Sequence, residues 1–497
     1  MRGLWRTMLT GGCAAAAMLA QTSASAAPVP ANAHDAYAAF TALMQARKCP
    51  EVLALYATPS VAGMLATLPV EMKLAVDAGG FDCARQSKQF DLALKFAIAG
   101  TQLNDPPPQF WFMRMDMEWA TGKHADMVSS LETLAATNHD ALAAVNLQWF
   151  DYGGRVLLAA KETDLQKRIN AVLGAPGFHP AKPGASTDGY RYAAAVSAMT
   201  AGHTDAAKAI FAQITDPAYL LRVTLDPRLR TLTPTGFDAR AAVERHMDAA
   251  REVAAAHPDN LGAMLALVHD YALIDKGPEI LALLLPIQPG KMHPALIAQP
   301  DQVHGWWSWV AMAYLMEGDY DKAIATLRQS MAPGEINEKN QLQLTDVAAM
   351  QLRFGRATDA LASLAPLEKV ADGFDLSAQA IARKLHGCAA WLGGIPAIAE
   401  TDLAYLHQHD ADAPGNSRAL ALCMHRDAEA AASFIKDLAD PDKTVGILVL
   451  FSTFTPAPKT LPHDWFRDGI DRLKMRPDVS AAITKAGGAG NFDIPPL

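Results

Sequence analysis

Short apolar stripes at helical spacing, each ended by a glycine or proline break, constrain this chain more than any other feature. Apolar residues recur three and four positions apart, which places them on one face of an α-helix, and alternating strand-like patterns are nearly absent. The breaks lie at 104–108, 176–177, 183–184, 257–259 and 414–415. Because helices this short cannot each bury an apolar face alone, we expect them to pack on one another as an all-α fold.

The tripeptide Gly-Phe-Asp precedes a helical run at 80–82, 236–238 and 373–375. An Asp carboxylate at the start of a helix accepts hydrogen bonds from free backbone N–H groups. The sequence therefore predicts that Asp82, Asp238 and Asp375 are helix N-caps.

The clearest repeat runs from Trp306 to Leu327. Its large residues are Trp307, Val310, Tyr314, Tyr320 and Leu327, and its small residues are Ala311, Gly318 and Ala323. Small residues let two helices cross closely, and large residues fill the space beside them. This pattern resembles the tetratricopeptide repeat (TPR), a helix-pair motif of about 34 residues.

A second unit follows, with Leu344, Val347, Ala348, Gly355, Ala360 and Leu364 in the same roles. The turn glycines Gly318 and Gly355 lie 37 residues apart (355 − 318). Weaker copies centre on Gly122, Gly202 and Gly394, whereas Gln351 and Arg426 replace an expected aromatic and an expected turn glycine. The resemblance implies an all-α superhelical solenoid of TPR-like helix pairs, about a dozen in number.

Four segments are expected along the chain. They are a signal peptide (1–26), degenerate TPR-like helical repeats (27–240), TPR-like repeats that are clearest at 305–365 (241–440), and capping helices with an extended tail (441–497). The signal peptide is indicated by Arg2 and Arg6, an apolar stretch over 8–20, and the small residues Ala24 and Ala26. A membrane anchor and a lipid on Cys13 are the alternatives. We expect export to the periplasm, with secretion as a further option.

Cleavage after Ala26 removes two basic and no acidic residues, so the mature charge is 41 − 52 = −11. This balance disfavours nucleic acid and anionic lipid as partners, because both require a dense basic surface. No later segment has the roughly 20 apolar residues that a membrane span needs. The most apolar stretch, 445–451, has the length of a buried core segment.

Four cysteines remain in the mature chain: Cys49, Cys83, Cys388 and Cys423. In an oxidising compartment an even number favours disulfides, and four cysteines allow three connectivities. We choose the sequence neighbours, Cys49 with Cys83 and Cys388 with Cys423. Four buried free thiols are the alternative.

No motif for phosphate binding, zinc hydrolysis or a nucleophilic serine is present, and we expect no catalytic residue, metal or cofactor. A zinc set of His386, Cys388, Cys423 and His425 competes with the disulfide, and His407, His409, Asp410 and Asp412 are typical of a solvated loop. Glycosidase-like carboxylate pairs would be Asp116 with Glu118 and Asp319 with Asp321, but Asp319 and Asp321 flank the turn of the repeat, where acidic residues serve as caps and solvated charge.

In TPR solenoids the first helix of each pair lines a concave surface that binds peptides or partner helices. The resemblance carries this groove over to Phe112, Asp116, Trp119, Tyr192, Met199, Met312, Leu315, Met316, Thr345, Leu352 and Arg353. Trp306 and Trp309 are additional aromatics of the kind that anchor interfaces. Packing against neighbouring helices is the alternative role for each of these residues.

The sequence favours a periplasmic TPR-type scaffold or adaptor that holds an envelope protein or peptide in its groove. Arg353 would pair with a carboxylate of that partner. Two other functions remain open: an envelope glycan or peptidoglycan hydrolase built on a closed α-helical toroid, and a purely structural spacer in an envelope assembly. The oligomeric state is not indicated.

Overall fold

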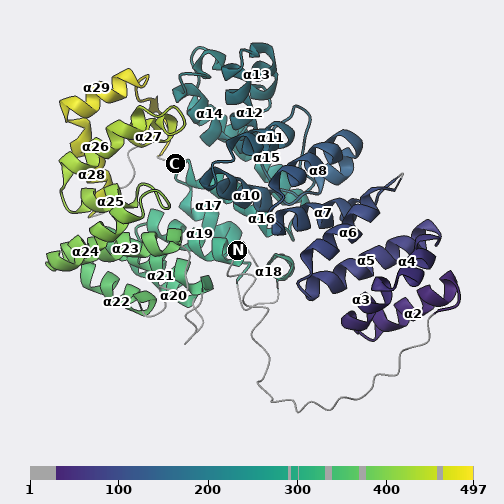
Figure 1. The fold of residues 1–497 in the computed structure, drawn as a ribbon. Helices are drawn as coiled ribbons and strands as arrows, with labels where there is room; N and C mark the ends of the chain where they lie inside the picture. The colour runs from purple at the N-terminus through teal and green to yellow at the C-terminus, as the bar shows by residue number, and fades with distance from the viewer. Residues whose placement is uncertain are drawn as a thin grey trace. The chain divides into compact units, whose positions relative to one another are not determined.

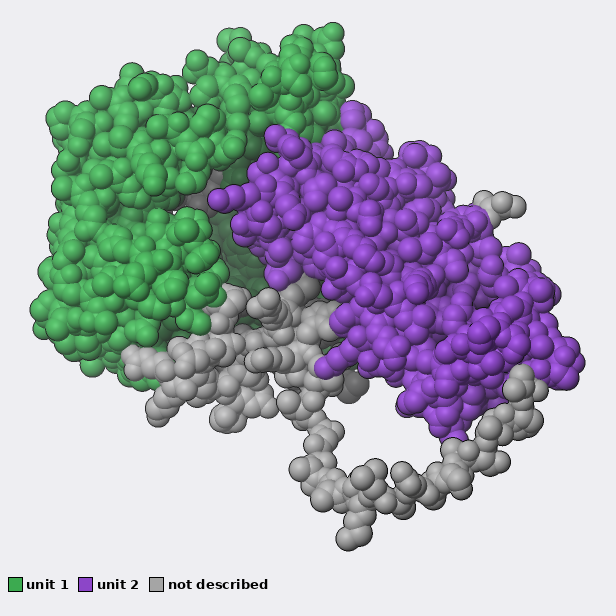
Figure 2. Space-filling view, viewed as in Figure 1, with its two compact units in different colours: residues 1–10, 182–497 green, residues 11–181 purple. Residues whose placement is uncertain are grey.

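A computed structural model describes residues 30–103, 105–288, 293–299, 302–330, 338–368, 376–455 and 463–495. The predicted signal peptide and Asp375 therefore lie outside the described residues. Within them the regular structure is helical apart from two short strands, β1 (Thr453–Phe454) and β2 (Asn491–Phe492), which pair in parallel. The chain divides into two compact units: unit 2 ends at residue 181, and unit 1 takes the chain from residue 182 onward (Figure 2).

Figure 1 shows the helices of both units, with labels on most of them. Those of unit 2 are α2 (Ala33–Gln45), α3 (Cys49–Ala57), α4 (Pro59–Ala66), α5 (Val70–Gln86), α6 (Phe90–Thr101), α7 (Pro108–Ala120), α8 (His124–Thr137), α9 (His139–Ala143), α10 (Leu147–Ala159) and α11 (Thr163–Leu173).

Unit 1 begins with α12 (Asp188–Thr200), α13 (Thr204–Phe211), α14 (Pro217–Leu225), the 3-10 turn η1 (Arg230–Leu232), α15 (Ala239–Ala256), α16 (Leu261–Ala272), α17 (Gly277–Leu284), α18 (Pro294–Ala298), α19 (Val303–Met316) and α20 (Tyr320–Gln329). It continues with α21 (Glu338–Arg353), α22 (Ala357–Glu368), α23 (Leu376–Leu392), α24 (Pro396–Gln408), α25 (Asn416–Cys423), α26 (Asp427–Leu438), α27 (Thr444–Phe451), α28 (Trp465–Lys474) and α29 (Pro477–Lys485).

One turn recurs between paired helices in both units. At the turn after α19, the N–H of Asp319 donates to the carbonyl of Tyr314 (2.8 Å), and the N–H of Gly318 donates to that of Leu315 (2.9 Å). This is the Schellman cap, which satisfies two carbonyls at the end of a helix and requires a left-handed residue. The same bonds and positive φ recur at Arg47, Lys88, Gly122, Lys161, Gly202, Asp275, Gly318, Gly355, Gly394 and His425.

This recurring turn confirms the predicted solenoid of TPR-like helix pairs. The predicted turn glycines Gly122, Gly202, Gly318, Gly355 and Gly394 all occupy the left-handed position. In the turn where Arg426 was expected to replace a glycine, the left-handed residue is the preceding one, His425, with φ 56°.

Unit 2 is built by contacts between helices that are close in the chain. Neighbours pack together from α5 to α8, and α11 returns to pack on α8. The core around α2–α6 contains Phe40, Val52, Phe81 and Phe96, all at most 4 % exposed.

Unit 1 closes on itself. Its helices pack in sequence from α14 through to α27, and α27 in turn contacts α14 (Figure 1). One apolar core joins the two ends: Leu221 of α14 and Val243 of α15 lie in the same buried cluster as Phe434 of α26 and Leu448 of α27. Ile494, two residues beyond β2, is also fully buried in this cluster. Unit 1 is therefore a closed ring of helices.

Three arginines near the start of unit 1 make polar contacts with residues near its end. Arg228 pairs with Asp442 (3.1 Å), Arg240 pairs with Asp493 (3.4 Å), and Arg230 donates to the carbonyl of Gly487 (3.4 Å). Each acceptor belongs to the last sixty residues of the chain, so the ends of unit 1 meet through charge as well as apolar packing.

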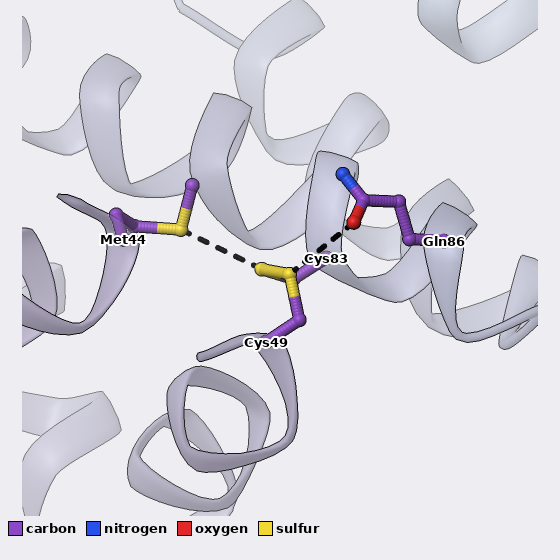
Figure 3. Close-up of a disulfide and its surroundings, with 4 residues drawn as sticks. All are labelled: Met44, Cys49, Cys83 and Gln86. Atoms are coloured by element: carbon purple, nitrogen blue, oxygen red, sulfur yellow. Dashed lines mark hydrogen bonds between the residues drawn. A yellow bond between two sulfur atoms is a disulfide. The ribbon is translucent and has the colours of Figure 1, made fainter. Parts of the chain in front are cut away.

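Both predicted disulfides are present. Cys49–Cys83 links α3 to α5 with a Cα–Cα distance of 4.8 Å, and Cys388–Cys423 links α23 to α25 with a distance of 5.7 Å. Figure 3 shows the first bridge, with Met44 Sδ 3.5 Å from Cys83 Sγ and Gln86 Oε1 3.8 Å from Cys49 Sγ. Each bridge skips one helix of the stack.

One of the two predicted helix N-caps in the described residues caps a helix, and the other does not. Asp238 is the N-cap of α15 and accepts a hydrogen bond from the N–H of Ala241 (2.9 Å), as predicted. The prediction for Asp82 is wrong, because the residue lies inside α5, whose apolar residues continue on both sides of it. The predicted boundary after residue 240 falls inside α15, and the one after residue 440 falls between α26 and α27.

Candidate functional site

The recurring turn sets a common register for the first helices. Phe112, Tyr192, Ser308, Thr345 and Lys384 each stand ten residues before a turn glycine, at 122, 202, 318, 355 and 394 respectively. Because the register repeats, these side chains occupy equivalent positions on successive first helices.

In unit 2 the first-helix face of α7 carries Phe112, Asp116 and Trp119. Their spacing of i, i+4 and i+7 puts them on one side of the helix, and all three are half-buried. On this face the predicted groove residues keep their side chains partly accessible.

Trp119 is held by aromatic neighbours from the next helices. Its ring stacks on His124 at 4.5 Å between centroids and meets Trp149 edge-on at 5.6 Å. A Cβ atom at Gly153 of α10 would lie 3.4 Å from the Trp119 ring, an ordinary van der Waals distance, so α10 packs against the indole at this glycine. His124 Nδ1 lies 2.8 Å from Glu162 Oε2, which holds the imidazole in place.

The two carboxylates of α7 have different environments. Glu118 is 1 % exposed and accepts hydrogen bonds from Arg114 Nε (2.8 Å) and Ser130 Oγ (3.1 Å). Asp116 has no hydrogen bond or ion pair within the described part of the chain, and burial raises its pKa while Arg85 of α5 lowers it. Glu118 therefore has a structural role, whereas the Asp116 side chain has no partner in the described residues.

In unit 1, Tyr192 is engaged by its own chain. Its hydroxyl donates to Asp226 Oδ2 (2.6 Å), and Arg228 binds the same carboxylate at 2.9 Å. Burial, and then the bond to Asp226, raises the pKa of Tyr192. Met199 is half-buried against the same core region.

Leu315 and Leu352 do not line an open groove. They are 8 % and 0 % exposed, because each packs between the second helix of its own pair and the first helix of the next pair. Thr345 is also buried, at 4 %. Met312 and Met316 stay half-buried, and Arg353 is exposed.

The two additional tryptophans differ in their roles. Trp306 is 2 % exposed, and its indole N–H donates to the carbonyl of Leu284 (3.0 Å), so its predicted role as an exposed anchor is wrong. Trp309 is half-buried, with His269 of α16 at 6.0 Å between ring centroids.

A polar group beside Met312 was missed in the sequence. Asp346 accepts a hydrogen bond from Ser308 Oγ (3.3 Å) and lies 3.9 Å from His304 Nε2. Burial raises the pKa of Asp346, whereas His304 and Ser308 lower it. Burial lowers the pKa of Lys384 on the following first helix. Counting ten residues back from each turn glycine would have found Ser308 and Lys384.

Five of the residues weighed for metal binding have other partners. Cys388 and Cys423 are oxidised, and His386 Nδ1 lies 2.7 Å from Asp402. His407 pairs with Glu429, and Asp410 accepts from Ser417. No group of three or more potential metal ligands was found among the described residues.

The second acidic pair is structural. Asp319 accepts the N–H of Lys322 (3.2 Å) as the N-cap of α20, and Asp321 pairs with Arg356 at 3.0 Å.

Among the described helices, none is long and apolar enough to cross a membrane.

No family model matches the sequence, and no curated protein matches it closely enough to be a relative. Among solved structures the chain is similar to the TPR domain of P58(IPK), with 12 % identity over 84 % of this chain and 99 % of that chain, at a TM-score of 0.18. It is also similar to yeast Tom70, with 11 % identity over 91 % and 99 % of the two chains, at a TM-score of 0.26. Scores this low add nothing to the fold assignment, which rests on the recurring turn.

Proposed function

We propose that this protein is a periplasmic scaffold that binds a partner protein or peptide on its first-helix faces. The observation that carries the proposal is that the first-helix faces of both units keep large apolar side chains half-buried, Phe112 and Trp119 in unit 2 and Met312 in unit 1. A folded chain that leaves large apolar groups partly open on the same face of its first helices has a surface suited to a second chain. Methionine adds a contact that adapts to different partners.

Capture from an envelope extract tests this function. The bait is residues 27–497 with an affinity tag ahead of residue 27, compared with Met312→Glu and Phe112→Glu. A charge buried at a binding surface is costly. Each variant is therefore expected to recover about tenfold less partner than the unmutated bait, equivalent to a loss of roughly 1.4 kcal/mol of binding free energy.

Met475→Glu is the matched control, because Met475 is 85 % exposed at the end of α28. It makes the same chemical change as Met312→Glu away from the first-helix faces and should recover the partner fully. Helical circular dichroism confirms that the variants are folded. Equal recovery by all baits, or no protein enriched over the tag alone, would refute the proposal.

Export is supported by the sequence features of residues 2–26 and by the two disulfides, which are typical of oxidising compartments. Fractionation of cells that produce the full chain tests it. Processed protein in the periplasmic fraction, with both cysteine pairs resistant to alkylation, is expected; unprocessed protein in the cytoplasm would contradict export.

The closed ring of unit 1 favours a second candidate, a hydrolase of envelope glycan or peptidoglycan. Closure is the geometry that this alternative required, although three of its four predicted carboxylates have structural partners. Incubating the purified protein with envelope polysaccharides and analysing the products separates the two functions, since a binding scaffold releases none.

A further inference from the structure

Asp116 differs from three glutamates of unit 2 in having no ion pair. In unit 2, Glu118, Glu132 and Glu162 each have a basic or imidazole partner, Arg114, Arg168 and His124. Asp116 is half-buried in the middle of the α7 face, with no such partner in the described residues. A carboxylate that has lost part of its water without gaining a direct ion pair is a destabilising element that an incoming cation would relieve.

The groups that flank Asp116 favour the same ligand. Phe112 lies one turn before it and Trp119 one turn after it, so aromatic residues stand on both sides of Asp116 along the helix face. Aromatic faces attract cations through their quadrupole, and tryptophan does so most strongly. The contacts of Trp119 with His124 and Trp149 fix its orientation in advance.

Arg85 does not fill this role. It is exposed on α5, and it acts on Asp116 through space without an ion pair in the described structure. Arg85 therefore offsets the burial of Asp116 only in part. The mature charge of −11 favours a basic partner over the whole molecule.

We propose that Asp116, flanked by Phe112 and Trp119, binds an arginine or lysine side chain of the partner polypeptide. This inference rests on the proposed binding function and specifies its chemistry in unit 2. The partner would carry a basic residue at this position, opposite in sign to the acidic partner predicted for Arg353.

Fluorine NMR of the mature protein labelled with 5-fluorotryptophan provides the test. The Trp119 resonance is assigned by its loss in Trp119→Phe. The protein is titrated with a Gly/Ser/Ala dodecapeptide that carries two arginines, and with the same peptide carrying citrulline, which keeps the shape of arginine without its charge. The arginine peptide should shift the Trp119 resonance, and the citrulline peptide should leave it in place.

Asp116→Asn should raise the dissociation constant of the arginine peptide about five- to tenfold. Asp126→Asn, at an exposed residue of the second helix α8, should leave it unchanged. Equal shifts by both peptides, no shift by either at millimolar concentration, or unaltered binding by Asp116→Asn would overturn the inference. Partner capture by Asp116→Asn at the unmutated level would also reject the cation site while leaving the scaffold function intact.

Discussion

Units 1 and 2 use the same turn-capped helix pair but assemble it differently. In unit 1 the last helices return to the first ones, and a single core holds both ends. In unit 2 the packing joins helices close in the chain, and a disulfide fastens its first helices. The comparison shows that the repeat determines local packing, whereas the residues at the ends decide whether a stack closes.

Truncating a side chain in the core that joins the two ends of unit 1 should have the largest effect on stability. Leu221 of α14 is 1 % exposed in the closure, so Leu221→Ala is expected to cost about 2–5 kcal/mol. Hydrogen exchange should become faster in α14 and also in α27, more than two hundred residues away.

Leu131→Ala in unit 2 is the control, because Leu131 is fully buried and the helices around it are close in sequence. Its faster exchange should be centred on α8 and its neighbours. If Leu221→Ala affects α14 alone, the closure does not stabilise unit 1.

Removing each disulfide in turn should distinguish the closed packing of unit 1 from the local packing of unit 2. Loops of 34 and 35 residues predict a similar loss, about 3–4 kcal/mol, for Cys49→Ser with Cys83→Ser and for Cys388→Ser with Cys423→Ser. Limited proteolysis should then cut α2–α5 readily in the first variant, whereas the closed ring should protect unit 1 in the second. Equal protease sensitivity would show that closure adds no protection.

The buried carboxyl group of Asp77 should make the stability of unit 2 depend on pH. It is 3 % exposed, and burial raises its pKa to about 6, with Lys73 opposing the shift. Because the folded state holds the proton more tightly than the unfolded state, the stability of unit 2 should fall as the pH rises from about 4 to about 6 and then level off. The loss is about 3 kcal/mol.

Asp77→Asn should remove this slope and raise the stability at pH 7. Urea unfolding at several pH values measures both effects, and Asp82→Asn on the exposed side of α5 is the control. An unchanged pH profile in Asp77→Asn would show that the buried carboxyl is not the cause.

Substitutions at the turns should give the smallest effects on stability, and glycine should be the more stable residue at the turns of both units. At Gly318 a Cβ would meet no atom within 4 Å, so Gly318→Ala tests backbone strain alone and should cost about 1–2 kcal/mol. Lys161 of unit 2 is exposed with φ 62°, and Lys161→Gly should stabilise by up to about 1 kcal/mol. Thermal unfolding would detect both; a destabilised Lys161→Gly would contradict the shared turn.

The sequence predicted the helix pairs because glycine marks a left-handed turn. It missed the same turn at Arg47, Lys88, Lys161, Asp275 and His425, since other residues adopt this conformation at a cost of only about 1–2 kcal/mol. Both disulfide pairings were predicted by pairing the sequence neighbours, whose partners lie 34 and 35 residues apart.

The groove was harder to predict, because the register alone does not show which side of a first helix the next pair covers. Leu315 and Leu352 fit the groove by position but are enclosed by the following helices. The closure of unit 1 leaves no local sequence signal, since Leu221 and Leu448 meet only through the path of the whole ring.

Closure of unit 1 is most directly tested by electron spin resonance between labels at Arg222→Cys in α14 and Leu450→Cys in α27, both exposed positions on helices that contact each other. With the native cysteines held in disulfides, the labels report one distance. Short neighbouring helices packed about 8–10 Å apart predict a narrow distribution below about 30 Å. A broad distribution centred well above that distance would show that unit 1 is an open stack.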